Sequence, residues 1–366
     1  MPEADWPRAC DAVPDPSLDP REWPVLTVVG PVGGEEHHAG RHRQHGHPER
    51  PSRVDAVMEG VADLHLGTDL SVLEARMAGP DRLVRVHGAA YLDRLEQLCA
   101  SGGGALDQDT YATEASWDAA RLSAGAGLVA IEALQADRDG VAFVVARPPG
   151  HHASADRPMG FCLLNNVAVA AMALVDAGQR VLIVDWDVHH GNGTQAIFWN
   201  EPHVLYVSTH QWPCYPGTGR PDEVGGPTAR GETLNVPLPP GATGDVVREA
   251  FDRVIGPAVE EFGPDWVLVS AGFDAHRADP LADLALSAGD FADLASTVAG
   301  YAPAPGRLVL FLEGGYDLGA LRSSVRACLG RLLGAPDTGE PPTSGGPGAR
   351  DLTTLMDARL EALHGL

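Results

Sequence analysis

Basic residues and cysteines are scarce in this chain, and long apolar runs are absent. Lys and Arg number 26 against 50 Asp and Glu in 366 residues, which gives a formal net charge of −24. Nucleic acids and anionic membrane surfaces need a basic protein face, so we expect neither as a partner. No apolar run is long enough to cross a bilayer. The acidity suits a cationic substrate such as a basic protein tail or a polyamine, and it equally suits general solubility.

The cysteines give no sign of a disulfide framework. Their number, 5, is odd, and no two of them form a CxxC pair. The chain begins with an acidic, proline-rich segment that lacks the basic and apolar regions of a secretory signal. We therefore expect a protein of the reducing cytoplasm.

Several common enzyme motifs are also missing. The sequence has no internal repeat, no P-loop, no GxSxG elbow and no Rossmann glycine fingerprint, which argues against kinases, serine hydrolases and dehydrogenases. The chain does have enough apolar sequence, 44% hydrophobic residues, to bury one large core. From 25–30 to about residue 333, strand-like apolar runs alternate with helical segments such as 116–134 and 166–177. This alternation predicts an α/β domain with a parallel sheet covered by helices.

The composition divides the chain into four segments. Residues 1–23, rich in Pro, Asp and Glu, are predicted to form a flexible N-terminal arm. The domain that carries the site then runs over 24–333, a Pro/Gly/Ser/Thr-rich linker covers 334–350, and a helix over 351–366 docks on the body. The histidine-rich segment 37–47 is expected to be a flexible loop, with a metal-binding cluster or a pocket rim as the alternatives.

The stretch VLIVDWDVHHGNGT at 181–194 is the strongest indication of function. An apolar run leads into Asp185, Asp187 and His189, and alternation along a strand would place these three side chains on one face. Two carboxylates and an imidazole at the end of a buried strand suit a divalent metal. The alternative is a strand end with solvated charges, which seldom follows so apolar a run.

Other buried-type strands also end in polar groups. The run WVLVSAGFD supplies a further carboxylate, Asp274. Three more runs end in His151 and His152, in Ser208 to Gln211, and in Gly314, Gly315 and Tyr316. In parallel α/β sheets, function gathers at the carboxyl ends of the strands, so we expect these groups to converge on one site.

A set of motifs occurs in order between Val25 and Leu332: HPERPSR (47–53), RPPGHH (147–152), GFCLLNN (160–166), DWDVHHGNGT (185–194), YPGTG (215–219), SAGFDAH (270–276) and EGGYD (313–317). Together they resemble the zinc-dependent histone deacetylase superfamily, on the side of its class II-like bacterial histone deacetylases and acetylpolyamine amidohydrolases. The resemblance implies an arginase/deacetylase-like three-layer α/β/α fold, with a central and mostly parallel sheet of about eight strands.

The resemblance also implies a metal centre. Asp187, His189 and Asp274 would be the zinc ligands, which leaves coordination positions open for water and for the amide carbonyl of a substrate. Fe²⁺ is an alternative to Zn²⁺, because a site of two Asp and one His is not strongly selective. A structural K⁺ is implied close by, near Asp185 and Ser208 and partly held by backbone oxygens.

Catalytic roles follow from the same resemblance. His152 matches the general base, and His151 is its charged neighbour, held by Asp185. Tyr316 would donate its hydroxyl to the oxyanion. Asn192 stands where one branch of the family has an Asp beside the second histidine. Since an amide cannot stabilise an imidazolium as a carboxylate does, we expect a lowered pKa for His152.

The substrate channel is implied by four further residues. Phe161, after Gly160, matches one aromatic wall, and Tyr215 stands where the opposite wall is usually Phe. Two aromatic rings suit a thin aliphatic stem such as that of acetyl-lysine. Leu281 falls where the polyamine-preferring branch has a glutamate, so a carboxylate that would select a second ammonium is missing there.

We therefore expect a zinc-dependent amidohydrolase that removes an acetyl or a short acyl group from the ε-amino group of an acylated lysine on a protein or peptide. A deacetylase of acetylpolyamines or of another acetylated small amine is the alternative. A catalytically silent module that holds an acylated tail is a third hypothesis. The sequence does not define the oligomeric state, and a homo-oligomer is compatible with it.

Overall fold

A single parallel sheet of 8 strands forms the centre of the protein, in the order β2-β1-β5-β10-β9-β6-β7-β8. The computed structural model describes residues 23, 25–30, 38–137, 139–335, 339–349 and 351–364. In chain order the strands are β1 (Leu26–Gly30), β2 (Leu70–Glu74), β5 (Val141–Val144), β6 (Val181–Asp185), β7 (Val204–Gln211), β8 (Thr233–Leu238), β9 (Trp266–Ala271) and β10 (Leu308–Leu312).

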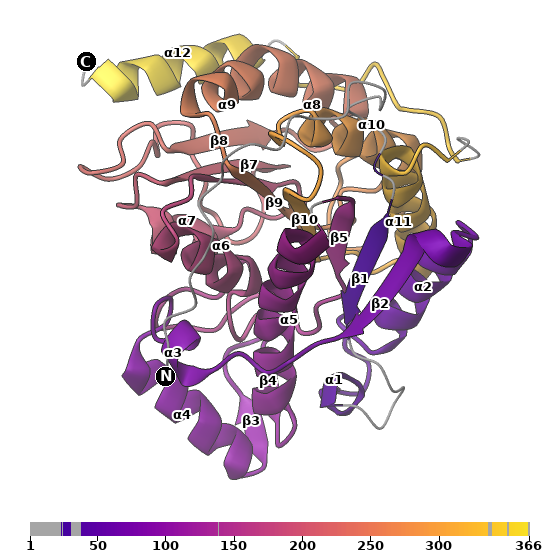
Figure 1. Ribbon diagram of the computed structural model, residues 1–366. Coiled ribbons are helices and arrows are strands. Elements are labelled where there is room, and N and C mark those ends of the chain that lie inside the picture. The colour runs from indigo at the N-terminus through magenta and orange to yellow at the C-terminus, as the bar shows by residue number, and fades with distance from the viewer. Residues whose placement is uncertain are drawn as a thin grey trace.

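Helices cover both faces of the sheet (Figure 1). One face packs against α2 (Ser52–Ala62), α8 (Gly244–Ala250), α9 (Gly256–Phe262), α10 (Ala288–Ala299) and α11 (Leu318–Leu332). The other face packs against α4 (Ala89–Ala100), α5 (Ser116–Asp137), α6 (Asn166–Asp176) and α7 (Asn192–Phe198). Successive strand residues alternate between the two cores: Phe143 lies in the first, and Ala142 and Val144 lie in the second. The predicted three-layer α/β/α fold is therefore confirmed.

Burial on both faces explains why the strands read as continuous apolar runs. All residues of β5, β6, β9 and β10 are buried. Each fully buried Val, Leu or Phe side chain stabilises the fold by roughly 1.5–3 kcal/mol. An alternating polar pattern would place polar groups in one of the two cores, so the parallel arrangement selects unbroken apolar sequence.

Side-chain caps fix where the site-bearing helices begin. Asn165 accepts a hydrogen bond from the backbone N–H of Ala168 at 3.0 Å, which starts α6. Asp317 likewise accepts from the N–H of Ala320 at 2.8 Å and starts α11. Each cap satisfies a backbone N–H that the first helical turn leaves free. Because Asp317 directly follows Tyr316, the start of α11 also limits where that tyrosine can lie.

The remaining elements are short. They are α1 (His38–Arg41), a 3₁₀ turn (Gly67–Asp69), α3 (Pro80–Leu83), the antiparallel pair β3 (Gly103–Ala105) and β4 (Tyr111–Thr113), and a π-helical turn (Phe251–Ile255). Within the described ranges, no helix combines the length and the apolar character that crossing a bilayer requires.

The segment 334–350, predicted as a linker, is bound to the body over its described residues 339–349. Thr343 donates from its N–H and its hydroxyl to the carboxylate of Asp290, at 3.1 and 2.7 Å. Ser287 donates its hydroxyl to the carbonyl of Pro341 at 2.8 Å. The composition of the segment did not reveal this docking, because hydrogen bonds rather than apolar side chains attach it.

Both ends of the domain are attached as well. Helix α12 (Asp351–His364) buries Leu352 and Leu355 against the body, and Arg359 donates to the carbonyl of Gly231 at 2.7 Å. Trp23, the last residue of the predicted N-terminal arm, is buried, and its N–H donates to the carbonyl of Leu332 at 2.8 Å. The rest of that arm, 1–22, lies outside the described residues.

Asp290 should matter strongly for stability. Its buried carboxylate also accepts from the N–H of Ser287 at 2.8 Å and pairs with Arg248 at 2.6 Å. Asp290→Ala leaves these donors unpaired and should lower the free energy of unfolding by about 3 kcal/mol in chemical denaturation. The control is Asp293→Ala on the same helix, where a partly exposed ion pair should contribute less than about 1 kcal/mol. Equal stability of the two variants would contradict this role.

Candidate functional site

The polar strand ends meet because the strands that carry them are neighbours. Strands β5, β10, β9, β6 and β7 are consecutive in the sheet, and all run in the same direction. The loops after them therefore leave from one edge. This confirms the expected convergence at the carboxyl edge of the sheet.

Asp185, Asp187 and His189 do not lie on one strand, so the predicted alternation was wrong. Strand β6 ends at Asp185, so Asp187 and His189 lie in the following loop and their convergence does not come from strand alternation. The N–H of Asp187 donates to the Asp185 carboxylate at 3.2 Å, and the N–H of His189 donates to the Asp187 carboxylate at 2.9 Å. Two successive turns of this kind replace the strand and still bring the side chains to the same place.

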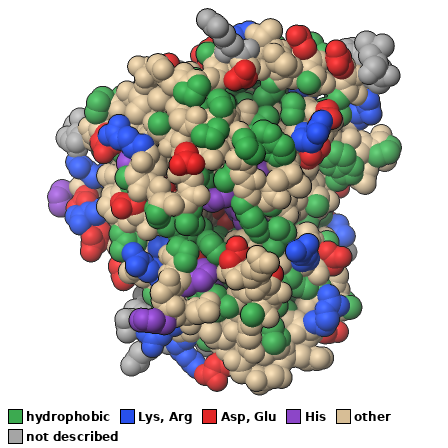
Figure 2. Space-filling model, turned by 180° about the vertical axis from the view of Figure 1, so that it is seen from behind, with side chains coloured by type: hydrophobic (Ala, Val, Ile, Leu, Met, Phe, Trp, Pro, Cys, Tyr) green, Lys and Arg blue, Asp and Glu red, His purple; other side chains and the backbone are tan. Residues whose placement is uncertain are grey.

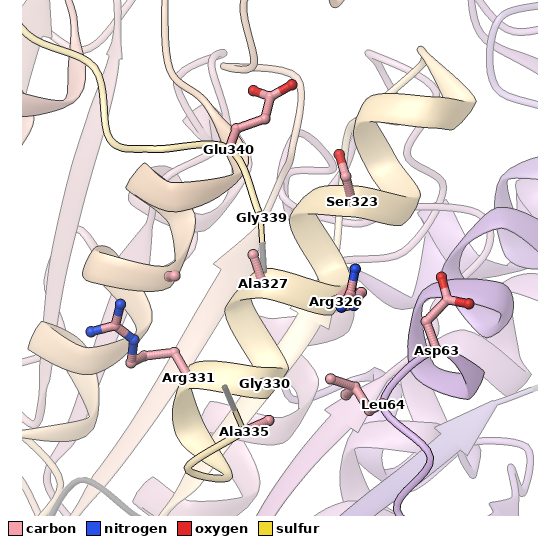
Figure 3. A pocket seen from close by; sticks show the side chains of 11 residues that line it. Asp63, Leu64, Ser323, Arg326, Ala327, Gly330, Arg331, Ala335, Gly339 and Glu340 are labelled. Atoms are coloured by element: carbon pink, nitrogen blue, oxygen red, sulfur yellow. The ribbon is translucent and has the colours of Figure 1, made fainter. Parts of the chain in front are cut away.

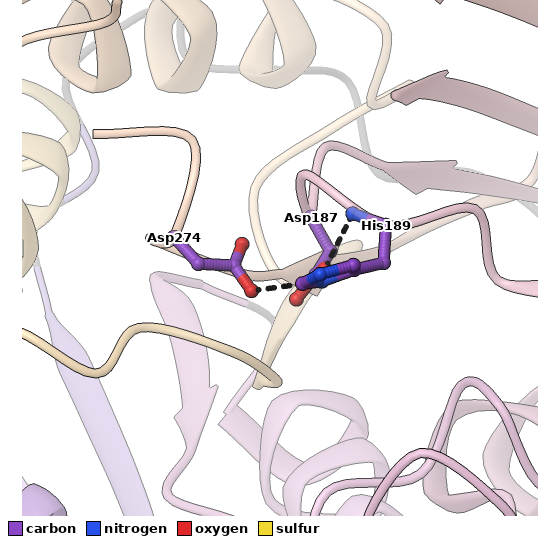
Figure 4. A group of neighbouring side chains, drawn as sticks. All are labelled: Asp187, His189 and Asp274. Atoms are coloured by element: carbon purple, nitrogen blue, oxygen red, sulfur yellow. Dashed lines mark hydrogen bonds and ion pairs between the residues drawn. The ribbon is translucent and has the colours of Figure 1, made fainter. Parts of the chain in front are cut away.

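Asp187, His189 and Asp274 form a candidate metal-binding group (Figure 4). One ligand atom from each lies within 4.8 Å of the others. Nδ1 of His189 is 3.2 Å from Oδ1 of Asp187 and 3.3 Å from Oδ2 of Asp274. Asp274 comes from the loop after β9, so the group joins two neighbouring strands.

The surroundings of this group fit a bound cation. Within the described chain, Oδ2 of Asp274 is buried and accepts no well-formed hydrogen bond. A Cβ atom on Gly314 would lie 1.9 Å from that oxygen, and one on Gly272 would lie 2.1 Å from Oδ2 of Asp187. The two glycines keep this space free. A set of two carboxylates and one imidazole, with room for further ligands, is typical of catalytic metal sites.

Next to the metal-binding group lie two histidines with different partners. Nδ1 of His151 is 3.0 Å from the Asp185 carboxylate, whereas Nδ1 of His152 is 2.8 Å from Oδ1 of Asn192. The two imidazole rings are 4.0 Å apart. All four residues lie where the sequence predicted them, with the predicted pairing.

The environments of the two histidines move their pKa values in opposite directions. Burial lowers the pKa of His151, but the nearby carboxylates, led by Asp185 and Asp187, outweigh it and raise that pKa to about 10. Burial, with the charges of His151 and His189, holds the pKa of His152 well below 6.5. The direction predicted for His152 is therefore correct, but burial rather than the identity of Asn192 is the main cause.

Tyr316 is held by its backbone and by an arginine. Its N–H donates to the buried carboxylate of Asp279 at 2.7 Å. The guanidinium of Arg53 lies 4.9 Å from the centre of its ring and donates to the carbonyl of Gly315 at 2.7 Å. Burial raises the pKa of the Tyr316 hydroxyl well above its usual value, so the hydroxyl keeps its proton. Arg53 and Asp279 were not predicted as site residues.

These groups surround a cavity of about 200 Å³. Its lining includes eight of the predicted residues, His151, His152, Gly160, Phe161, His189, Tyr215, Leu281 and Tyr316. Asp109, Pro149 and Gly314 complete it. Figure 2 shows a face of the molecule with a central hollow, where histidine side chains are visible between hydrophobic ones. Such a narrow cavity, polar at its base, suits an aliphatic chain that ends in a polar group.

The backbone at Gly160 and Phe161 is left-handed, with φ of 54° and 67°. A Cβ atom on Gly160 would lie 2.3 Å from the ring of His152, so only glycine fits beside that histidine. The backbone of Phe161 is strained in this conformation, because a bulky side chain disfavours a positive φ. Its N–H donates to the hydroxyl of Thr110 at 3.1 Å, and its ring meets that of Tyr316 edge-on at 5.8 Å.

The histidine-rich segment does not form a metal-binding cluster among its described residues, and two of its histidines are packed rather than free. His42 is buried, 2.6 Å from the hydroxyl of Ser116, and stacks on Tyr111. The ring of His47 contacts Phe161 edge-on at 4.6 Å, and its Nε2 is 2.9 Å from the carbonyl of Asp109. His47 therefore packs beside two residues that line the cavity, Phe161 and Asp109, while no residue of 42–47 lines the cavity itself. His37 lies outside the described residues.

A larger hollow of about 530 Å³ lies elsewhere, among α2, α10 and α11 (Figure 3). Its lining is mostly small, with Ala292, Ala327, Gly330 and Ala335 beside Arg326 and Arg331. It shares no residue with the cavity at the metal-binding group. The larger hollow has no cluster of acids and histidines like the one beside the smaller cavity, so the candidate site rests on that cluster and not on cavity size.

Comparison with known proteins agrees with this geometry. The family description "Histone deacetylase domain" matches residues 47–332. The chain belongs to the histone deacetylase family. "Histone deacetylase 10, chloroplastic" of Oryza sativa subsp. japonica is 40% identical to it, over 89% of this chain and 76% of the relative. The "Histone deacetylase-like amidohydrolase" of Pseudomonas aeruginosa is 39% identical, over 77% and 79%.

A solved structure gives the same result for the fold. The structure titled "Crystal Structure of HDA15 HD domain" superposes with a TM-score of 0.83 at 35% identity, covering 93% of this chain and 98% of the other. Together with the site geometry, these matches make the chain a hydrolase of the histone deacetylase family with a candidate metal-binding group.

Removing a candidate ligand should abolish tight metal binding. Metal-stripped Asp274→Ala should bind zinc at least about 100-fold more weakly than the metal-stripped wild type in isothermal titration calorimetry, because the substitution removes a side chain that binds the metal directly. Asp279→Asn is the matched control: it alters another buried acid of the same loop, which holds the Tyr316 N–H instead. It should bind zinc as the wild type does. If Asp274→Ala binds zinc as tightly as the wild type, Asp274 is not a metal ligand.

Proposed function

We propose that the protein removes acetyl or other short acyl groups from the ε-amino group of lysine, using one divalent metal. The observation that carries this proposal is the cavity of about 200 Å³, in which His152, His189 and Tyr316 meet at the base of an aromatic-lined channel. Its dimensions suit the four-carbon stem of lysine, with the amide group next to the metal-binding group.

The walls would hold the stem and the base would hold the amide. Phe161 and Tyr215 contribute aromatic surface to the channel, and Leu281 and Tyr215 are each 38% exposed at its mouth. An apolar stem that lies between aromatic rings is removed from contact with water. In this position the carbonyl of the substrate points towards the metal-binding group. Tyr316 lines the same cavity, so its hydroxyl can donate to the oxygen of the carbonyl as negative charge develops.

A metal held by Asp187, His189 and Asp274 would act as a Lewis acid towards the carbonyl and lower the pKa of an attacking water. His152, neutral because of its lowered pKa, takes the proton from that water and returns it to the leaving amine. His151 stays protonated beside Asp185 and stabilises negative charge next to the base. Tyr316 donates without losing its proton.

We propose Zn²⁺ as the metal, with Fe²⁺ as the alternative, since the ligand set alone does not separate them. A structural K⁺ near Asp185 and Ser208 is also part of the proposal. In support, Ser208 is buried and pairs with Asp185 between β6 and β7, so oxygen atoms of both residues lie in the same part of the sheet. Dialysis against potassium-free buffer should lower the rate of acetate release, and added potassium should restore it.

Acetylated small amines are the second candidate substrates. The acidity of the chain favours a cationic amine as substrate. Asp109 also favours it, because this acidic residue lines the cavity. Leu281 argues against a polyamine-specific enzyme, because it places an apolar side chain in the lining. The ratio of kcat/KM for an acetyl-lysine peptide to that for an acetylated diamine decides between the two classes.

The reaction is tested by acetate release from an acetyl-lysine peptide. Tyr316→Phe removes only the hydroxyl that faces the carbonyl, and kcat should fall about 10²- to 10³-fold. A chelator should abolish turnover, and zinc should restore it. Tyr301→Phe, which alters a tyrosine that stacks on Phe251 and does not line the cavity, is the control and should leave kcat unchanged. If wild-type protein loaded with zinc releases no acetate, the proposal fails.

The pH profile tests the role of His152. The pKa of His152 lies well below 6.5, so His152 stays unprotonated between pH 8 and pH 6.5. Its protonation should therefore not lower kcat/KM of the wild type in this range. Asn192→Asp places a carboxylate at the position 2.8 Å from Nδ1 and raises the pKa. The base is then protonated at higher pH, so the acid limb of kcat/KM should move up by about 1 unit or more. An unshifted acid limb would mean that another group is the base.

A further inference from the structure

The carboxylate of Glu313 has no part in the mechanism above, although it lies directly behind the catalytic histidines. Glu313 follows β10 and is fully buried. It is not among the residues that line the catalytic cavity. A charged group in such a position is costly to bury, and burial raises its pKa to about 7. Its position therefore calls for a role that does not involve contact with substrate.

The contacts of Glu313 point to the loop that carries the histidines. Oε2 accepts hydrogen bonds from the backbone N–H groups of Gly150 and His151, at 2.7 and 3.2 Å. Oε1 accepts from the hydroxyl of Ser270, on β9, at 3.3 Å. One carboxylate oxygen thus holds the loop after β5, and the other rests on the neighbouring strand on the opposite side of β10.

The loop after β5 is also held from a second side, by the start of α6. Its position therefore depends on Glu313 and on α6 together. A Cβ atom on Gly150 would lie 2.5 Å from the N–H nitrogen of Asn166, so the loop presses against the start of α6. Asn166 donates from its side chain to the carbonyl of Pro148 at 3.1 Å. Without the acceptor at Glu313, the two N–H groups would be buried and unpaired, and the loop would move to pair them.

We propose that Glu313 is a positioning residue for the catalytic histidine pair. By fixing the N–H groups of Gly150 and His151, it sets where the His151 ring meets Asp185 and where the His152 ring meets Asn192. The inference rests on the proposed function for its effect on catalysis, but the hydrogen bonds themselves do not depend on it. Displacement of a general base by a fraction of an ångström lowers kcat, and it leaves binding of the substrate stem in the channel unaffected.

The test separates position from charge with two conservative variants. In Glu313→Gln the amide oxygen can accept from both N–H groups, but the charge is lost. In Glu313→Asp the charge remains, but the side chain is one methylene too short to reach them. Glu313→Ala loses both. Ser270→Ala is the matched control, because it removes the partner of the other carboxylate oxygen and leaves the two N–H contacts in place.

Two readouts are measured on each variant. Hydrogen exchange at the amides of Gly150 and His151 should speed up about tenfold or more in the Asp and Ala variants, and change little in the Gln and Ser270→Ala variants. With an acetyl-lysine peptide, kcat should fall about 10- to 100-fold in the Asp and Ala variants with KM within about twofold, while the Gln variant retains kcat within about threefold. Zinc stoichiometry should stay unchanged throughout.

The outcomes are distinguishable from failure of the proposed function. If the wild type hydrolyses no acyl-lysine, the exchange measurement still decides whether Glu313 holds the loop. An Asp variant with wild-type exchange and kcat, or a Gln variant as slow as the Asp variant, would overturn the positioning role. If the Ala variant does not fold, the comparison of the Gln and Asp variants carries the test alone.

Discussion

A concentration of buried carboxylates at one edge of the sheet is the constraint on which the rest of the site depends. Asp185, Asp187 and Asp274 are all buried there, and the ligand atoms of Asp187 and Asp274 lie within 4.8 Å of the same histidine. Burying several acids together is unfavourable unless positive charge compensates them. His151 supplies part of that charge, as its raised pKa shows, and a divalent cation would supply the rest.

The same constraint separates the roles of two adjacent histidines. His151 faces Asp185 and holds a proton, whereas His152 faces the neutral amide of Asn192 and loses its proton readily. Neighbouring charges and burial therefore give the two imidazoles opposite protonation states, which fits the proposed roles of charge stabiliser and general base. Gly160 makes this arrangement possible, because a side chain at that position would collide with the His152 ring.

The sequence predicted the fold and the positions of most residues of the candidate site, and its errors have physical causes. Buried parallel strands leave apolar runs that are readable in the chain, and the polar groups after them, such as Asp274 and Tyr316, mark the carboxyl edge. The pattern could not show that turns end β6 before Asp187, that His47 packs on Phe161, or that Thr343 binds the body. The turns after Asp185 are local, but their alternating polar residues look the same in the sequence as a strand that continues. The other two features depend on contacts between distant segments, for which local composition carries no signal.

The metal centre is tested most directly by anomalous diffraction from crystals of zinc-loaded protein. One strong peak is expected about 2.0–2.2 Å from Nδ1 of His189 and from a carboxylate oxygen of both Asp187 and Asp274. That result would make the buried acids the ligands of the catalytic metal. A peak at the histidine-rich segment 42–47 instead, with none between Asp187 and Asp274, would show that the buried acids do not bind the metal.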